Sequence, residues 1–139
     1  MTIRYLLDTN IVSQPISRRP DRKVISRLTE YGGHCAIAAP IWHELTYGCE
    51  RLPAGRRKTA LEDYLKSVVQ SSFPILPYDE LAAAWHGRER ARLETLGKAA
   101  PYVDGQIAAI TKQNGLTLVT ANAKDFALFD GLSVVDWSA

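Results

Sequence analysis

Short apolar segments that alternate with amphipathic helical segments are the feature that most constrains the fold of this chain. Strand-like runs stand at residues 3–7, 35–39, 75–76, 117–120 and 132–136. Helical spacing of apolar residues occupies residues 20–31, 40–49, 56–69, 79–96 and 103–113. In the segment 56–69, the buried side is expected to carry Leu61, Leu65 and Val68. Strands separated by helices pair in parallel through right-handed crossovers, so helices cover both faces of the sheet. The pattern therefore predicts an α/β fold, a three-layer α/β/α sandwich with a central, mostly parallel sheet.

The composition fits one compact unit. With 139 residues, 46% of them hydrophobic, the chain suits a single domain over residues 1–139. No apolar run approaches the ~20 residues of a membrane span, and the first residues lack the pattern of a signal peptide. We therefore expect a cytoplasmic protein with no membrane partner. Cys35 and Cys49, the only cysteines, are too few for a disulfide framework or a thiolate zinc site and are expected to be buried.

Four acidic residues stand where this fold would bring them together. Asp8 follows the first strand, and Asp125 lies in the segment after the strand at 117–120. Glu44 and Asp104 stand near the starts of helices that begin at the same sheet edge. Ligands of parallel sheets bind outside the carboxyl ends of the strands. We therefore expect the four carboxylates to converge at that edge.

Converging carboxylates point to a particular chemistry. Their mutual repulsion raises their pKa values and is relieved when a cation neutralises them. A cluster of oxygen ligands without histidine or thiolate favours Mg²⁺ or Mn²⁺ over Zn²⁺. Such ions bind phosphate oxygens and make bound water more acidic. This predicts the chemistry of a nuclease.

Each acidic residue also has a structural interpretation. Asp8 would cap the turn that follows it, and Glu44 alone would be an ordinary solvated helix residue. Asp104 stands at a position typical of a helix N-cap. Asn122 and Asp125 have the spacing of a capping box, so Asp125 is either a site acid or part of a helix cap. Only the combination of four acids favours the functional interpretation.

Several motifs in this order resemble those of PIN-domain ribonucleases, specifically the VapC-type toxins of VapBC toxin-antitoxin pairs. The resemblance covers essentially the whole chain. Its motifs are LLDTN at residues 6–10, HEL at 43–45 with Gly48, Asp104 followed by IAA at 107–109, LVTAN at 118–122 leading into Asp125, and Asp136-Trp137.

The resemblance implies a role for each matching residue. Asp8, Glu44 and Asp104 would be metal ligands for Mg²⁺, with Mn²⁺ as a substitute, and Asp125 would be a fourth acid. Asn10, Thr120 and Asn122 would be supporting polar residues. Ala121 stands where an arginine is common in the family, and we expect one firmly held metal ion with a second arriving alongside RNA.

The implied function is an endoribonuclease toxin that hydrolyses RNA phosphodiester bonds and leaves a 5′ phosphate and a 3′ hydroxyl. The implied partners are the RNA substrate, a VapB-like antitoxin that blocks the site, and a second copy of the chain in a homodimer. A basic cluster is a candidate for RNA binding by charge, although a solvated helix face explains it equally well. The cluster consists of Arg51, Arg56, Arg57 and Lys58.

Two other functions remain open. A phosphatase of the haloacid dehalogenase type would use Asp8 as its nucleophile, but Asn10 stands where that chemistry requires a second acid. A catalytically silent PIN-like scaffold would bind RNA or protein without cutting. The presence of all four acids disfavours the scaffold.

Overall fold

A five-stranded parallel sheet organises the chain, as seen in a computed structural model that describes residues 2–139; Met1, at the start of the predicted domain, lies outside the described residues. The strand order is β3-β2-β1-β4-β5, and each neighbouring pair is parallel. The prediction of an α/β sandwich with a parallel sheet is confirmed, and the last strand lies at one edge of it. The strands are β1 (Tyr5–Leu7), β2 (Cys35–Ala38), β3 (Ile75–Leu76), β4 (Thr117–Val119) and β5 (Ser133–Val135).

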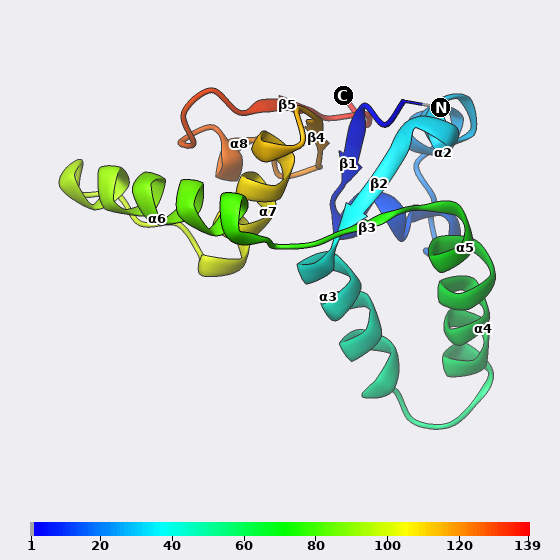
Figure 1. Cartoon of the computed structure of the whole chain (residues 1–139). Helices are drawn as coiled ribbons and strands as arrows, with labels where there is room; N and C mark the ends of the chain where they lie inside the picture. The colour runs from blue at the N-terminus through cyan, green and yellow to red at the C-terminus, as the bar shows by residue number, and fades with distance from the viewer. Residues whose placement is uncertain (1) are drawn as a thin grey trace.

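Helices lie on both sides of this sheet (Figure 1). One side carries α6, α7 and α8, and the other carries α2, α4 and α5, while α3 runs away from the edge where β1 and β2 end. Within residues 2–139, none of the helices combines the length and apolar character needed to cross a membrane. The helices are α1 (Thr9–Val12), α2 (Arg22–Tyr31), α3 (Ala39–Glu50), α4 (Arg56–Tyr64), α5 (Gln70–Ser72), α6 (Glu80–Thr95), α7 (Tyr102–Gln113) and α8 (Ala123–Phe126), with 3-10 turns at Gln14–Ile16 and Gly32–His34.

The core forms around the three central strands. Leu6, Ile37 and Leu118 are completely buried, because helices cover both faces of β1, β2 and β4. This double burial explains why the strands are continuous apolar runs rather than alternating ones. Both cysteines are buried, as expected. Trp137 packs its ring 5.2 Å from that of Tyr5, so the end of the chain folds back onto the sheet.

The segment after α4 departs from the predicted helix at residues 56–69. A π-helical turn at Leu65–Val69 follows α4. Because a π-helix has a longer repeat than an α-helix, the next residue to face the core comes one position later in the sequence. The predicted apolar stripe ended at Val68, which is exposed, whereas Val69 is fully buried. The prediction of Val68 as a core-facing residue is therefore wrong.

Residues 8–10 form a helix start rather than a simple turn. The Asp8 side chain accepts a hydrogen bond from the backbone N–H of Thr9 and caps the one-turn helix α1. The helix α6 also begins with a side-chain cap, because Asp79 accepts a hydrogen bond from the N–H of Ala82 at 2.9 Å. Gly115, with φ of 64°, ends α7 in the left-handed conformation typical of a helix stop.

Candidate active site

Asp8 lies at the carboxyl end of β1 and is the most buried of the four candidate acids, with 8% of its surface exposed. Its two oxygens accept hydrogen bonds from the Thr9 N–H and the Thr120 hydroxyl, both at 2.8 Å. Burial raises the pKa of Asp8 above its usual value, the Thr120 and Thr9 bonds oppose that rise, and the negative charge of Glu44 adds to it. The carboxylate is held firmly, at an energetic cost to its ionised form.

Glu44 comes from α3 and is joined to β1 through Thr9. The Thr9 hydroxyl donates to Glu44 Oε2 at 2.9 Å, while the Thr9 N–H donates to Asp8. One residue therefore connects two acids that lie 36 positions apart. Sequence reasoning missed Thr9 because its place beside Asp8 suggested only a capping role.

Asp104 lies in the first turn of α7 and is the third residue of that helix. The N-cap position belongs to Pro101, so the expectation that Asp104 stands at an N-cap position is wrong. Asp104 is half-buried, and burial is the largest cause that raises its pKa. The negative charges of Asp8, Asp125 and Glu44 raise its pKa further, in that order. The Asp104 carboxyl is therefore close enough to all three of the other acids for their charges to disfavour its ionised form.

Asp125 lies on α8 in an exposed position, and the alternative interpretation of a capping box does not hold. The Asn122 side chain makes no capping hydrogen bond. The Asn122 N–H donates to the Thr120 hydroxyl at 3.0 Å instead of to the side chain of Asp125. The structure therefore leaves Asp125 available to contribute its charge to the acidic group around Asp104.

The three supporting polar residues take part in one hydrogen-bond network. Thr120, completely buried, donates to Asp8 and accepts from the Asn122 N–H. Asn10 accepts from the N–H of Ala121 at 3.1 Å, and its amide lies 3.5 Å from Asp8 Oδ2. Asn10 thereby connects the turn after β4 to the turn after β1. This structural role differs from the catalytic role that a second acid would have at this position in a dehalogenase-type phosphatase.

The chemistry of the donor set fits a hard divalent cation, since the four acids offer only oxygen ligands. Two of them, Asp8 and Asp104, have pKa values raised in part by the other members of the group. A cation at this edge would remove that repulsion. Within residues 2–139, however, no three His, Cys, Asp or Glu side chains are gathered tightly enough to hold an ion.

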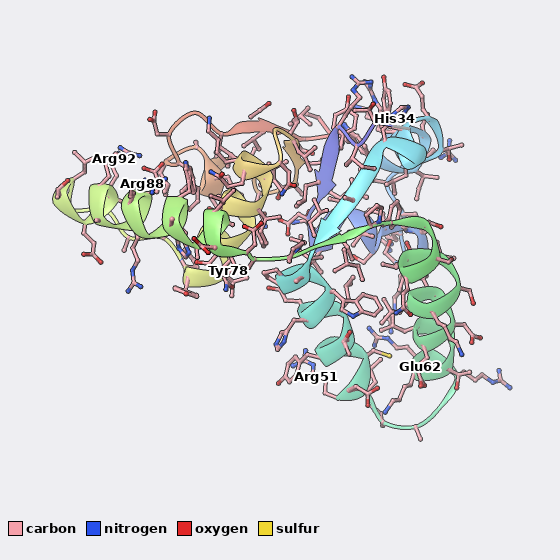
Figure 2. The ribbon with its side chains drawn as sticks, in the orientation of Figure 1. His34, Arg51, Glu62, Tyr78, Arg88 and Arg92 are labelled. Carbon is pink, nitrogen blue, oxygen red and sulfur yellow. The ribbon has the colours of Figure 1, made fainter. Side chains whose placement is uncertain are left out.

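The basic cluster of Arg51, Arg56, Arg57 and Lys58 lies elsewhere. These residues stand where α3 ends and α4 begins, at the far end of the α3–α4 hairpin (Figures 1 and 2). Seven residues separate Arg51 from Glu44, which corresponds to about 10 Å along the helix axis. The Lys58 ammonium donates to the Glu50 carbonyl at 3.1 Å, and the Arg51 guanidinium lies 5.5 Å from the Tyr47 ring centroid. RNA binding by this cluster stays a prediction.

Replacing Thr120 by valine is expected to destabilise the protein by about 2 kcal/mol. The substitution keeps the shape but removes the hydroxyl that donates to Asp8 and accepts from Asn122, leaving two polar groups without this partner. Urea unfolding followed by circular dichroism measures the change. Thr120→Ser keeps the hydroxyl and should cost less than half as much. Equal losses in the two variants would show that the hydroxyl contributes little.

A pH dependence follows from the raised pKa of Asp104. The pKa of Asp104 in the folded protein lies above the usual value of 3.8, so the folded state binds the proton of this carboxyl more tightly than the unfolded state does. This contribution to stability is fully present below pH 3.8 and is lost as the pH rises through the folded-state pKa. In a buffer with chelator, Asp104→Asn should melt at a higher temperature than the native chain at pH 7. The difference should vanish below about pH 4. A melting difference that is the same at both pH values would contradict this sign.

Comparisons with known proteins identify the family of the chain. A family model described as "PIN domain" matches residues 5–132. "Ribonuclease VapC2" of Haemophilus influenzae is 35% identical to this chain over 136 residues, covering 97% of this chain and 98% of that protein. "tRNA(fMet)-specific endonuclease VapC" of Shigella flexneri is 32% identical over 136 residues, covering 98% and 99%.

A solved structure shares both fold and sequence with the chain. DNA-bound VapBC from Salmonella typhimurium contains a chain that superposes with a TM-score of 0.85 and 26% sequence identity, over 98% of this chain and 99% of that chain. The match therefore covers nearly the whole fold. The chain belongs to the PIN-domain family and, within it, to the VapC-type toxins.

Proposed function

We propose that the protein is a metal-dependent endoribonuclease that hydrolyses RNA phosphodiester bonds and leaves a 5′ phosphate and a 3′ hydroxyl. The observation that carries the proposal is the set of hydrogen bonds from Thr9 and Thr120 that brings Asp8 and Glu44 together at the carboxyl edge of the sheet. Asp104 and Asp125 add their negative charges to this group. Two relatives named as nucleases, each similar over nearly the whole chain, support the same activity.

Asp8, Glu44 and Asp104 would hold the ion, Mg²⁺ with Mn²⁺ as a substitute. When bound, the ion supplies positive charge at the phosphodiester and a more acidic water. Thr120 holds the Asp8 carboxylate in place, and Thr9 contacts both Asp8 and Glu44. Asp125, exposed on α8, adds the fourth charge.

An antitoxin partner belongs to the same proposal. We infer that a VapB-like protein covers the acidic site and blocks access of RNA, and that the toxin acts as a cytoplasmic homodimer. The similarity to a chain of the Salmonella typhimurium VapBC structure supports this partner. Expression of the chain alone should arrest bacterial growth, and co-expression of a short DNA-binding protein encoded beside it should restore growth.

The activity is tested by titrating Mg²⁺ against a panel of cellular RNAs and determining the chemistry of the new ends. The expected result is cleavage of single-stranded or looped RNA that requires Mg²⁺ or Mn²⁺. Structured RNAs such as transfer RNA belong in the panel because the Shigella flexneri relative is named for one. Binding of RNA without cleavage at any ion concentration would favour the scaffold function instead. Hydrolysis of a small phosphomonoester without RNA cleavage would favour the phosphatase.

A further inference from the structure

A cavity of about 190 Å³ lies between α6 and the first turn of α7, the helix that carries Asp104. This volume is below the ~300–1,000 Å³ of pockets that take drug-sized ligands, and it suits one planar ring system. None of the four acidic residues lines it, so it is separate from the acidic group. Its polar and aromatic lining consists of His86, Arg90, Glu94, Lys98, Tyr102 and Phe129.

The aromatic wall of the cavity is partly exposed. Tyr102 is 54% exposed, and its ring centroid lies 4.9 Å from that of His86. The Arg90 guanidinium lies 5.7 Å from the centroid of the same tyrosine ring. Proteins that recognise unpaired RNA stack bases on aromatic rings and on arginine planes. Tyr102 and Arg90 provide both kinds of surface, with the guanidinium lying over the tyrosine ring.

His86 gives this wall a rigid support. It is buried, and its Nδ1 forms a hydrogen bond of 2.8 Å with the hydroxyl of Tyr78, which stands just before α6 (Figure 2). Its other edge lies so close to Gly105 that a Cβ there would be 2.1 Å from His86 Nε2. The imidazole is therefore held between Tyr78 and the backbone of α7. A base stacked on Tyr102 would meet a wall that does not have to be ordered first.

The charges around the cavity favour a phosphate. Arg90 and Lys98 supply two positive charges, and Glu94 supplies one negative charge 3.7 Å from the Arg90 guanidinium. The excess is positive, in contrast to the acidic group on the other side of the first turn of α7. An anion would thus be attracted to the cavity, with its neutral ring portion against Tyr102.

Resting on the function proposed above, we propose that this cavity binds the base and phosphate of one unpaired nucleotide next to the phosphodiester that is cut. Tyr102 and Asp104 lie two residues apart in the first turn of α7, about 3 Å apart along its axis but on different sides of the helix, so an RNA strand that wraps around this turn would reach both. Base-paired RNA offers no free ring for the cavity. The site thereby restricts cutting to single-stranded or looped RNA with a base at this position.

The binding test needs no cleavage. Adenosine 5′-monophosphate and ribose 5-phosphate are titrated separately into the isotopically labelled native chain and followed by NMR. The nucleotide should shift the resonances of Tyr102 and His86, and ribose 5-phosphate should bind at least 10-fold more weakly. Tyr102→Ala should weaken nucleotide binding about 10-fold, whereas Tyr102→Phe should retain it. Equal binding of both probes, or no effect of Tyr102→Ala, would overturn the proposal.

Arg88 provides a matched control for Arg90. The two arginines lie on α6, and two residues of helix turn them about 200° apart. Arg88 is exposed outside the cavity, on the side of α6 that also carries Arg92 (Figure 2). Arg90→Ala should weaken nucleotide binding several-fold and Arg88→Ala should leave it unchanged. Equal weakening by both would reduce the site to general charge attraction and contradict the proposal.

The cleavage test uses single-stranded RNAs with one abasic nucleotide at successive positions around the cut. At one position, the missing base should raise the KM of the native chain about 10-fold with little change in kcat. In Tyr102→Ala, the missing base at that position should leave KM unchanged. The same rise in KM in both proteins would overturn the proposal. If the native chain cuts no RNA but still binds adenosine 5′-monophosphate through Tyr102, the nuclease function fails while the nucleotide site stands.

Discussion

Replacing Asp8 or Asp104 by asparagine is expected to slow RNA cleavage by about 1,000-fold without unfolding the protein. Each substitution removes a charge from the group in which Asp8, Glu44 and Asp125 act on Asp104. Asparagine keeps an oxygen that accepts the Thr9 hydrogen bond, so the cap of α1 survives at position 8. Initial rates at saturating Mg²⁺, with circular dichroism of each variant, measure the effect.

Asp63 offers a control for charge alone. It is exposed on α4, outside the acidic group, so Asp63→Asn should cut at the native rate. If Asp8→Asn and Asp104→Asn also cut at the native rate, the assignment of these carboxylates to the reaction is wrong. A loss of activity that follows a loss of helical signal would instead report on folding.

Replacing Gly105 by alanine is expected to destabilise the protein by about 3 kcal/mol. A Cβ at this position would lie 2.1 Å from His86 Nε2 and less than 3 Å from two further ring carbons. The ring has little room to retreat because it is buried and bonded to Tyr78. The first turn of α7, which carries Asp104, would have to shift away from α6. Urea unfolding gives the change in free energy.

Gly87 is the matched control, because it lies in α6 with no atom within 4 Å of an added Cβ. Gly87→Ala should stabilise the protein by up to ~1 kcal/mol through higher helix propensity. The double variant His86→Ala, Gly105→Ala should lose less stability than the sum of the losses in the two single variants. The reason is that the added methyl group no longer meets the imidazole ring. Simple additivity would contradict the clash.

The sheet was predictable because its central strands are buried on both faces. Continuous apolar runs such as residues 35–38 are readable as central strands, and their alternation with helices determines parallel pairing. The π-helical turn at Leu65–Val69 was not predictable, because a sequence with apolar residues at 61, 65 and 68 fits an ordinary helix equally well. Packing against the core decided that Val69 rather than Val68 is buried.

The acidic residues of the candidate site could be found from topology, whereas their connections could not. Asp8 and Asp125 follow parallel strands, and the rule that ligands bind at the carboxyl ends brought them into one hypothesis. The bond from Thr9 to Glu44 depends on the angle at which α3 leaves β2, which no local pattern records. The contact between His86 and Gly105 likewise joins two helices whose approach only tertiary packing defines.

The central claim is that the four carboxylates form one negatively charged group that binds a divalent ion. Titration of Mn²⁺ into the protein, with free Mn²⁺ measured by electron paramagnetic resonance, tests it most directly. The account predicts saturable binding to the native chain that weakens at least ~10-fold in both Asp8→Asn and Asp104→Asn and is unchanged in Asp63→Asn. Equal affinity of all four proteins for Mn²⁺ would contradict it.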